Sequence, residues 1–298
     1  MSFFSEITNE FASQQSQFWN YTKDSLKHPA LKNVYYAVFL AYLLCFFLEV
    51  VLPKQRKHGV ISRKYFWQDT FYVLFNDILI NVLGFFALCA VTEFILYKFL
   101  LIFNIHSIKI VDITNLNPLI QILIMFILQD FCEWLAHIIL HRSDFFWEFH
   151  KIHHAQEELG AASTRHFHWV EMVVFKPLIF IPFALIGYSA VDYFLFQITV
   201  QNVWGFFTHM NIKVKWGWLN YIINTPESHA WHHAKNIDRK YGVNYASILN
   251  IWDLIFGQFY LPKDKQPILG VEGGKEVPTT FIGQLLYPFK KHFSRRKK

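Results

Sequence analysis

The sequence has few charged residues. Of its 298 residues only 17% are charged, whereas 53% are hydrophobic and Phe alone occurs 33 times. Soluble domains usually carry about 25% charged residues, and here the apolar residues gather in long blocks. A soluble protein with an unusually large core is therefore disfavoured, and the composition predicts an integral membrane protein.

Cysteine is also scarce, and its three residues, Cys45, Cys89 and Cys132, all lie inside apolar stretches. None forms a C-x-x-C pair, so neither a disulfide framework nor a thiolate metal site is expected. Buried, unreactive thiols are the simpler interpretation. The glycines never form a G-x-G-x-x-G pattern, so the sequence predicts no flavin or nicotinamide site of that kind.

Four apolar blocks have the length of membrane segments, because a spanning helix needs about 20 mostly apolar residues. The blocks are Tyr35–Leu52, a stretch within Thr70–Phe103, Pro118–Leu140 and Met172–Phe207. The last block contains Pro177, Pro182 and Gly187, which favours two short helices that enter and leave the membrane on one side. The preceding residues, 1–33, have an apolar pattern that favours an interfacial helix.

Basic residues concentrate at two places and favour one orientation. The connector after the first block carries Lys54, Arg56, Lys57, Arg63 and Lys64, and a second group crowds the C-terminus. Because basic loops remain cytoplasmic, this arrangement places the clustered histidines described below on the cytoplasmic side. Contact with anionic headgroups explains the basic runs better than nucleic-acid binding does.

The sequence therefore predicts an all-α, integral membrane helical bundle of about four spanning or hairpin segments with a cytoplasmic-facing, histidine-rich helical cap. The predicted divisions are an N-terminal interfacial segment (1–33), membrane spans (34–129), a histidine-rich catalytic domain (130–262) with a membrane hairpin (172–207), and a basic tail (263–298).

Histidine is the residue type that stands out, with 15 copies. Eight of them form one H-x-x-x-H and two H-x-x-H-H clusters: His137 and His141; His150, His153 and His154; His229, His232 and His233. Residues i, i+3 and i+4 share a helix face, so each cluster projects its imidazoles into one small volume. Neutral imidazole suits Fe, Zn, Cu and Ni, and eight exceed what one ion accepts, so two neighbouring metal ions are predicted.

Two carboxylates precede the first cluster on the same helical face. Asp130 and Glu133 lie seven and four residues before His137. A metal-bound histidine usually donates its second N–H to a carboxylate or a carbonyl, so both are candidates for that role. Ion pairs with Arg142 or Lys151 are the alternative. Four histidines far from the clusters, His28, His58, His106 and His292, are interpreted as structural.

The clusters resemble those of a known family. H-I-I-L-H, W-E-F-H-K-I-H-H and T-P-E-S-H-A-W-H-H are similar to the histidine boxes of the fatty acid hydroxylase and sterol desaturase superfamily, over about Asp130 to Pro262. The resemblance implies two iron ions, which zinc can replace in purified material, together with dioxygen and electrons from a separate donor protein. It implies hydroxylation or desaturation of a lipid from the bilayer: a sterol, a fatty acyl chain or an ether lipid.

The resemblance also implies the ligands. The eight box histidines match, and His209 resembles a family histidine that is followed two residues on by Asn, here Asn211. The family often has an Arg-x-His-Pro-x-x-Glu-like element, where this chain reads R-H-F-H-W-V-E without the Pro. The His-x-x-Glu step fits His168 and Glu171, so His168 is the expected tenth ligand and His166 the alternative. The residues expected around the ligands are Asp130, Glu133, Glu171 and Asn211.

Two other functions use the same clusters. A membrane metallohydrolase with zinc is one, although such sites usually have three protein ligands and a water. A non-catalytic metal-binding or transport protein is the other, although a transporter places its ligands near the bilayer midplane. The spacing does not decide which lipid is oxidised, or whether the membrane is a bacterial inner membrane or the endoplasmic reticulum.

Overall fold

The computed structural model describes residues 3–28, 33–52, 58–82 and 84–295. Regular structure within these residues is helical, apart from isolated bridges between Ile223 and Leu249 and between Ala234 and Leu269. The predicted all-α class is therefore confirmed for the part of the chain that the structure describes. Lys54, Arg56 and Lys57 of the basic connector and the last three residues of the tail lie outside the described residues.

The N-terminal helices have different surroundings. Helix α1 (Phe3–Lys27) packs along α4 (Phe85–Leu101), and α2 (Val34–Val51) packs along α8 (Ala190–Thr208). Asn33 caps the N-terminus of α2: its side-chain oxygen accepts from Tyr35 N and so satisfies one of the free N–H groups of the first turn. Its bounds agree within one residue with the first predicted block.

The second predicted block divides into two helices. Helix α3 (Phe66–Val82) and helix α4 meet at Gly84, whose φ of +66° lies in the left-handed region that glycine tolerates best. A Cβ at Gly84 would lie 2.3 Å from Gln15 Oε1 of α1. The sequence analysis places one span within Thr70–Phe103 and does not anticipate this division, since apolar composition alone does not register the close approach of α1.

Two helices of the described residues, α2 and α5 (Pro118–Arg142), are long and apolar enough to cross a membrane. Both present large apolar side chains outward, among them Leu44, which is 58% exposed, and Leu119, which is 77% exposed. Such outward faces suit contact with lipid rather than water. The predicted membrane association agrees with these two helices.

The fourth predicted block is a helical hairpin. Helix α7 (Trp169–Leu185) and α8 are joined at Gly187, whose φ is +101°. Pro177 and Pro182 both lie inside α7, so the chain reverses at the glycine and not at a proline. The hairpin places the C-terminal end of α8 beside η1 (Ala161–Arg165) and α9 (Pro226–His232).

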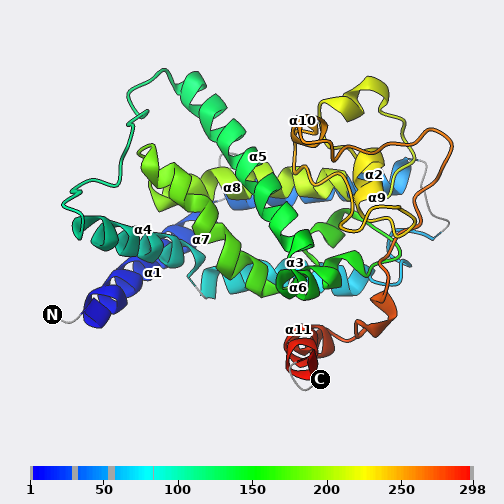
Figure 1. Cartoon of the computed structure of the whole chain (residues 1–298), viewed down its shortest axis with the longest axis horizontal. Coiled ribbons are helices and arrows are strands. Elements are labelled where there is room, and N and C mark those ends of the chain that lie inside the picture. Colours follow the sequence, from blue (N-terminus) through cyan, green and yellow to red (C-terminus); the bar gives the residue numbers. More distant parts are fainter. Residues whose placement is uncertain (1–2, 29–32, 53–57, 83, 296–298) are drawn as a thin grey trace.

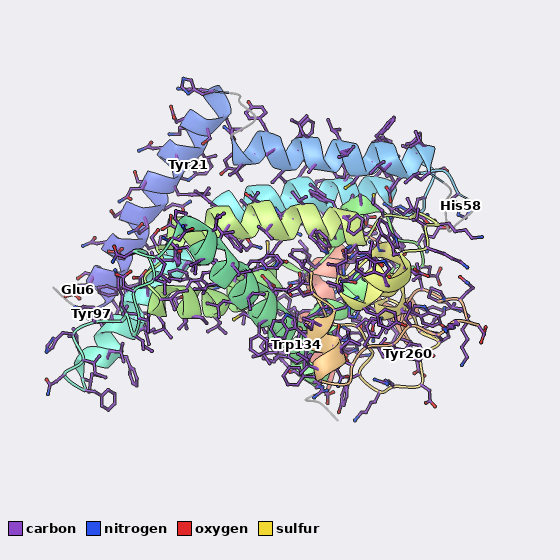
Figure 2. All side chains as sticks on the ribbon, turned by 90° about the horizontal axis from the view of Figure 1, so that it is seen from above. Glu6, Tyr21, His58, Tyr97, Trp134 and Tyr260 are labelled. Atoms are coloured by element: carbon purple, nitrogen blue, oxygen red, sulfur yellow. The ribbon has the colours of Figure 1, made fainter. Side chains whose placement is uncertain are left out.

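The remaining elements follow α5 in the chain. They are α6 (Asp144–His154), η2 (Gly217–Tyr221), α10 (Ile251–Ile255), η3 (Gly274–Glu276) and α11 (Phe281–Arg295). Helices α9 and α10 lie at the right of Figure 1, whereas α1 and α4 lie at the left. Trp134 and Tyr260 lie at the end that is rich in loops, and Glu6 and Tyr97 lie at the opposite end (Figure 2).

Candidate metal centre

Nine histidines converge in two adjacent groups. The first histidine cluster consists of His137, His141, His150, His154 and His232, and the second consists of His153, His209, His229 and His233. Within each cluster one nitrogen of every ring lies within 4.8 Å of those of the others. The rings of His154 and His233, one from each cluster, stack with centroids 4.4 Å apart. The two clusters are therefore neighbours.

Each H-x-x-H-H motif is divided between the clusters. On α6, His150 and His154 turn to the first cluster and His153 to the second. At α9 the division is reversed, because His232 joins the first cluster while His229 and His233 join the second. The prediction that each motif fills one volume is thereby corrected: i and i+4 point one way and i+3 points to the neighbouring group.

The nitrogen spacings fit a metal ion. Nε2–Nε2 distances are 3.1 Å for His137–His150, 3.2 Å for His150–His154 and 3.1 Å for His209–His229. Nitrogens bound to one ion at about 2.1 Å would lie roughly 3.0–3.4 Å apart for octahedral to tetrahedral angles. Among the described residues, His141 Nε2 and His232 Nε2 are buried without a hydrogen-bond partner. A bound cation would satisfy both nitrogens.

The opposite ring nitrogens are held by the protein. His137, His141 and His232 donate from Nδ1 to the carbonyls of Tyr245, Tyr241 and Val243, at 2.8, 3.0 and 2.8 Å. A hydrogen bond from Nδ1 fixes the tautomer and leaves the Nε2 lone pair available for a metal. The segment 241–245 thus orients three rings of the first cluster, a role that the sequence analysis missed because carbonyl oxygens have no side-chain signature.

Other groups hold four more rings. His150 Nδ1 donates to Glu171 Oε2 at 2.9 Å, and His209 Nδ1 donates to the Gly205 carbonyl at 2.9 Å. His153 Nδ1 donates to the His166 carbonyl at 3.3 Å. His229 Nδ1 lies 3.2 Å from Asn224 Nδ2. Of the four residues expected around the ligands, only Glu171 has a hydrogen bond to an imidazole.

Asp130 binds the backbone near the rings and does not contact an imidazole. It accepts from Ile248 N at 2.8 Å, from Leu249 N at 3.0 Å and from Trp252 Nε1 at 2.8 Å. Asp253 supports the same stretch of chain by accepting from Ala246 N and Trp134 Nε1. These carboxylates therefore fix the position of the loop that follows segment 241–245.

Glu133 and Asn211 also lie away from the ring nitrogens. Glu133 pairs with Lys176 and accepts from Gln129 Nε2 at 2.8 Å. Asn211 donates its backbone N–H to Glu49 Oε1 at 2.7 Å. Helical periodicity places Glu133 on the same helix face as His137. It does not show that Glu133 pairs with Lys176 of α7 instead of with an imidazole.

His168 does not join either cluster. It caps α7 by accepting from Val170 N at its Nδ1, 3.2 Å away, and donates from Nε2 to the Leu285 carbonyl at 3.1 Å. Its ring packs on Phe149 and Phe289. Both nitrogens are occupied, which corrects the expectation of a tenth ligand at this position.

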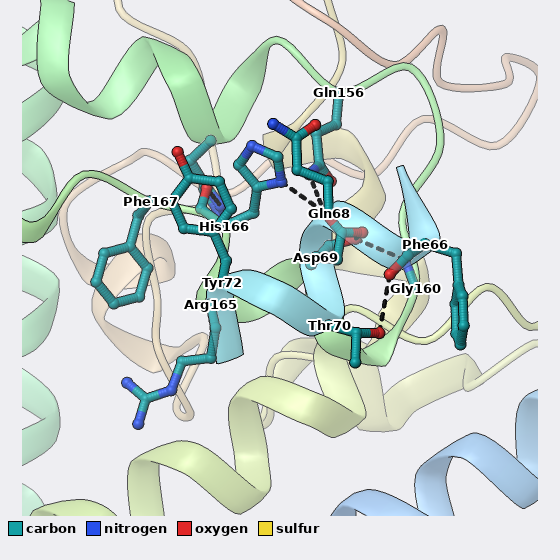
Figure 3. Close-up of polar contacts among 12 residues, drawn as sticks. Phe66, Gln68, Asp69, Thr70, Tyr72, Gln156, Gly160, Arg165, His166 and Phe167 are labelled. Atoms are coloured by element: carbon teal, nitrogen blue, oxygen red, sulfur yellow. Dashed lines mark hydrogen bonds and ion pairs between the residues drawn. The ribbon is translucent and has the colours of Figure 1, made fainter. Parts of the chain in front are cut away.

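His166 is likewise occupied elsewhere. Its Nδ1 lies 2.5 Å from Asp69 Oδ1, its Nε2 lies 3.0 Å from Gln284 Oε1, and its ring stacks on Tyr72. Asp69 also pairs with Arg63. It accepts from Gln156 Nε2 at 2.6 Å (Figure 3). His166 contributes to the centre through its backbone carbonyl, which holds His153.

Burial keeps the clustered imidazoles neutral. It is the main cause that holds the pKa values of His150, His153 and His154 well below 6.5, and the neighbouring imidazoles add to the effect. Burial also lowers the pKa of His209 to about 4. Rings that are neutral near pH 7 have a lone pair to offer, which is the form in which histidine binds a metal.

Two cavities reach the centre. The helix cavity, about 190 Å³, is lined by residues of α5, α7 and α8 and by His137, His150, His153, His209 and His229. The loop cavity, about 560 Å³, is lined by charged and polar residues of segments 235–242 and 270–273 and by His141, His154 and His232. The first cluster therefore borders both cavities, whereas the second borders only the helix cavity.

Comparison with known proteins agrees with this centre. Residues 122–258, which contain all nine clustered histidines, match the family model described as fatty acid hydroxylase. No solved structure matches the chain significantly.

Three relatives have known activities. An ornithine lipid hydroxylase of Rhizobium tropici is 31% identical over 57% of this chain and 50% of its own length. An alkylglycerol monooxygenase of Homo sapiens is 30% identical over 46% of this chain and 30% of its own length. A methylsterol monooxygenase of Arabidopsis thaliana is 23% identical over 51% of this chain and 52% of its own length. The chain thus spans about half or less of the length of these relatives.

Proposed function

Because residues 122–258 belong to the fatty acid hydroxylase family, we propose that this protein is a membrane-bound, two-metal oxidoreductase that uses dioxygen to hydroxylate or desaturate a lipid at a C–H bond. The observation that carries the proposal is the convergence of nine imidazoles in two adjacent clusters composed only of histidine. Zinc hydrolase sites usually have three protein ligands and an open position, so five and four histidines favour the redox function over hydrolysis.

The proposed ligands are the nine clustered histidines, and the proposed ions are two irons. Iron bound there would supply the oxygen activation and C–H cleavage that amino-acid side chains cannot perform. The protein's own part is to keep the rings neutral, to fix the tautomers of six of them through Nδ1, and to limit the access of water by burying the second cluster. The catalytic domain proposed from the sequence, residues 130–262, contains every one of these rings.

The lipid is proposed to enter the helix cavity. Its wall combines apolar side chains such as Leu140, Met172 and Phe175 with five of the clustered histidines. The relatives act on an ornithine lipid, an alkylglycerol and a methylsterol by name, which supports a lipid substrate here without choosing among these classes.

The proposed topology is multi-pass, with the metal centre at the cytoplasmic face. Glu49, near the C-terminal end of α2, accepts from Ala161 N and Asn211 N. His137 and His141 lie near the C-terminal end of α5. Both helices thus end at the level of the centre, and the basic connector follows α2 directly, which favours the cytoplasmic side for this end.

Electrons are proposed to come from a separate protein through the loop cavity. Lys235, Arg239 and Lys240 line it together with His141, His154 and His232 of the first cluster. Asp144, Asp238 and Glu272 line the same cavity, so its rim carries both signs of charge, and a partner with complementary charges would meet it faster. This route is distinct from the helix cavity, so donor and lipid would not compete for one opening.

Metal analysis and a lipid assay test the proposal. The full chain, purified in detergent after expression with iron, is expected to contain about two irons per chain, as two clusters require. With dioxygen and a reductant it should convert a membrane lipid into a product with one added oxygen atom or one new double bond, with added oxygen traced by isotopic labelling. One zinc per chain and a hydrolysed lipid would overturn the proposal in favour of a hydrolase.

A further inference from the structure

The helix cavity has a polar stretch of wall that the proposed oxidation chemistry does not use. Helix α8 contributes Gln197, Gln201 and Asn202 to this wall, followed by Gly205, Thr208 and His209 near its C-terminal end. Polar side chains inside a helical hairpin of this apolar character are costly unless they have a partner, and they mark functional positions. The partners of Gln201 and Asn202 are therefore informative.

Two amide nitrogens in this wall have no partner within the described part of the chain. Asn202 is only 5% exposed, and its Nδ2 is buried without a hydrogen-bond acceptor. Gln201 accepts from Ser247 Oγ at 2.5 Å through Oε1, while its Nε2 is buried and unpaired. Because most buried donors in folded proteins are satisfied, two adjacent unsatisfied NH₂ groups in a cavity wall point to an acceptor atom on a ligand.

The neighbouring charges select the kind of acceptor. The cavity is lined by two cations, Lys176 and Arg165, and by two carboxyl groups, Glu133 and Glu171. Lys176 is paired with Glu133, which also accepts from Gln129. Lys176 therefore has its charge balanced by the protein itself. Two neutral NH₂ donors beside a balanced ion pair suit a neutral carbonyl oxygen better than a free carboxylate.

The position of these donors fixes the orientation of the ligand. Asn202 precedes His209 by seven residues on α8, which corresponds to about 10 Å along the helix axis. Gly205 lies between them without a side chain, in close contact with Thr164 of η1. Because Asn202 and His209 line the same cavity, a chain bound at Asn202 can extend within that cavity to the histidines.

We propose that the lipid bound in the helix cavity carries an ester- or amide-linked carbonyl, whose oxygen accepts hydrogen bonds from Asn202 Nδ2 and Gln201 Nε2. The carbon to be oxidised then lies about two helical turns from this carbonyl, beside the clusters. This assignment rests on the proposed function for the identity of the cavity. It adds the substrate class, an acyl ester or amide, and the two residues that determine specificity.

The test is a binding measurement that needs no turnover. The full chain is purified in detergent with its metal and titrated without dioxygen or reductant against four probes of one chain length: octadecanamide, methyl octadecanoate, octadecanoic acid and octadecane. The amide and the ester should bind about tenfold more tightly than octadecane, the difference that one net hydrogen bond of about 1.4 kcal/mol produces.

The variants assign the preference to residues. Asn202→Leu and Gln201→Leu should each lower the affinity for the amide and the ester about tenfold, leaving octadecane binding and metal content unchanged. Asn202→Asp, which keeps the shape but replaces the donor with an acceptor, should do the same if the leucine variant does not fold. Thr199→Val is the matched control, because Thr199 lies on α8, bonds to the Leu195 carbonyl and does not line the cavity.

Any of three results would overturn the assignment. One is equal affinity of the wild-type protein for octadecanamide and octadecane, and another is an unchanged preference in both Asn202 variants. Tighter binding of octadecanoic acid than of both neutral probes would also overturn it, in favour of a carboxylate site. Because binding is measured without turnover, a protein that binds the amide through Asn202 but oxidises no lipid would contradict the proposed function and leave this assignment intact.

Discussion

The two histidine clusters are built from the same motifs but have different surroundings. The first cluster has five rings, borders both cavities, and takes three of its Nδ1 acceptors from the single segment 241–245. The second cluster has four rings, all buried, and borders only the helix cavity. The two clusters therefore differ in ring number and in the cavities that they border, although both receive histidines from the same two motifs.

The difference in ring number has a chemical consequence. An ion held by four histidines keeps more coordination positions open than one held by five. The second cluster, which leaves more positions open, borders only the helix cavity, where the lipid is proposed to bind. The first cluster, which leaves fewer positions open, also borders the polar loop cavity. We therefore expect the second site to be nearer the oxidised carbon and the first site to receive electrons.

The largest expected effect comes from adjacent residues of α6. His153→Ala should remove the second ion and His154→Ala the first, so that each variant retains about one iron per chain. Both should lower lipid oxidation by more than about 100-fold, the upper end of losses caused by outer partners of metal ligands. Metal analysis and product formation measure the two quantities.

Exposed His106 provides the control for these variants. His106→Ala should keep both irons and full activity, because it lies far from the clusters in sequence and belongs to neither. If His153→Ala and His154→Ala both lost two irons, the clusters would form one cooperative site and the comparison would fail.

Asp130→Asn should weaken the first site selectively. Asp130 holds the backbone of Ile248 and Leu249 and the indole of Trp252, and so fixes the loop that follows segment 241–245. The amide keeps only one acceptor oxygen, so that loop and the carbonyls before it lose their fixed position. Affinity for the first ion should fall about 10- to 100-fold, measured by competition with a chelator.

The second site and an exposed aspartate serve as references for Asp130→Asn. The affinity for the second ion should change less, because the Nδ1 acceptors of His153 and His209 are the His166 and Gly205 carbonyls, which lie outside this loop. Asp264→Asn on an exposed loop should change neither affinity. An equal loss at both sites would mean that Asp130 stabilises the fold as a whole.

Glu171→Gln should have a smaller effect on the same cluster. Only His150 depends on this carboxylate, through one hydrogen bond of 2.9 Å. Replacing the charge by an amide weakens that bond without removing it, so a loss of about tenfold in affinity for the first ion is expected. Glu133→Gln is the matched control, since Glu133 contacts Lys176 and Gln129 and no imidazole nitrogen. A larger loss in Glu133→Gln than in Glu171→Gln would contradict this assignment.

The sequence predicts the elements whose signal is local. The long apolar runs predict α2, α5 and the α7–α8 hairpin, because a run of about 20 apolar residues has the length of a membrane-spanning helix. The spacing of the boxes identifies the eight histidines that, with His209, make up the two clusters. These features depend on residues that are neighbours along the chain.

The features that escaped prediction depend on distant partners. Gly84 divides a continuous apolar block because α1 packs against it. The i, i+3, i+4 rule places the rings of one motif on one helix face. It does not show that α6 and α9 divide their histidines between the two clusters in opposite ways. Asp130 and Glu133 have the spacing of direct partners of His137, yet backbone amides of the 248–249 loop and Lys176 reach them instead.

The smallest effect on the centre is expected from His168→Ala. Both of its ring nitrogens are used, one by the N-terminus of α7 and one by the Leu285 carbonyl of α11. The variant should therefore keep about two irons and lose about 1–2 kcal/mol of stability, the usual cost of removing a helix cap and one hydrogen bond. Metal analysis and thermal unfolding in detergent measure these quantities. His168→Asn, which can still cap α7, should recover part of the stability. Loss of an iron in His168→Ala, with His168→Asn failing to restore it, would show that the residue is a ligand and that the two clusters are not limited to nine rings.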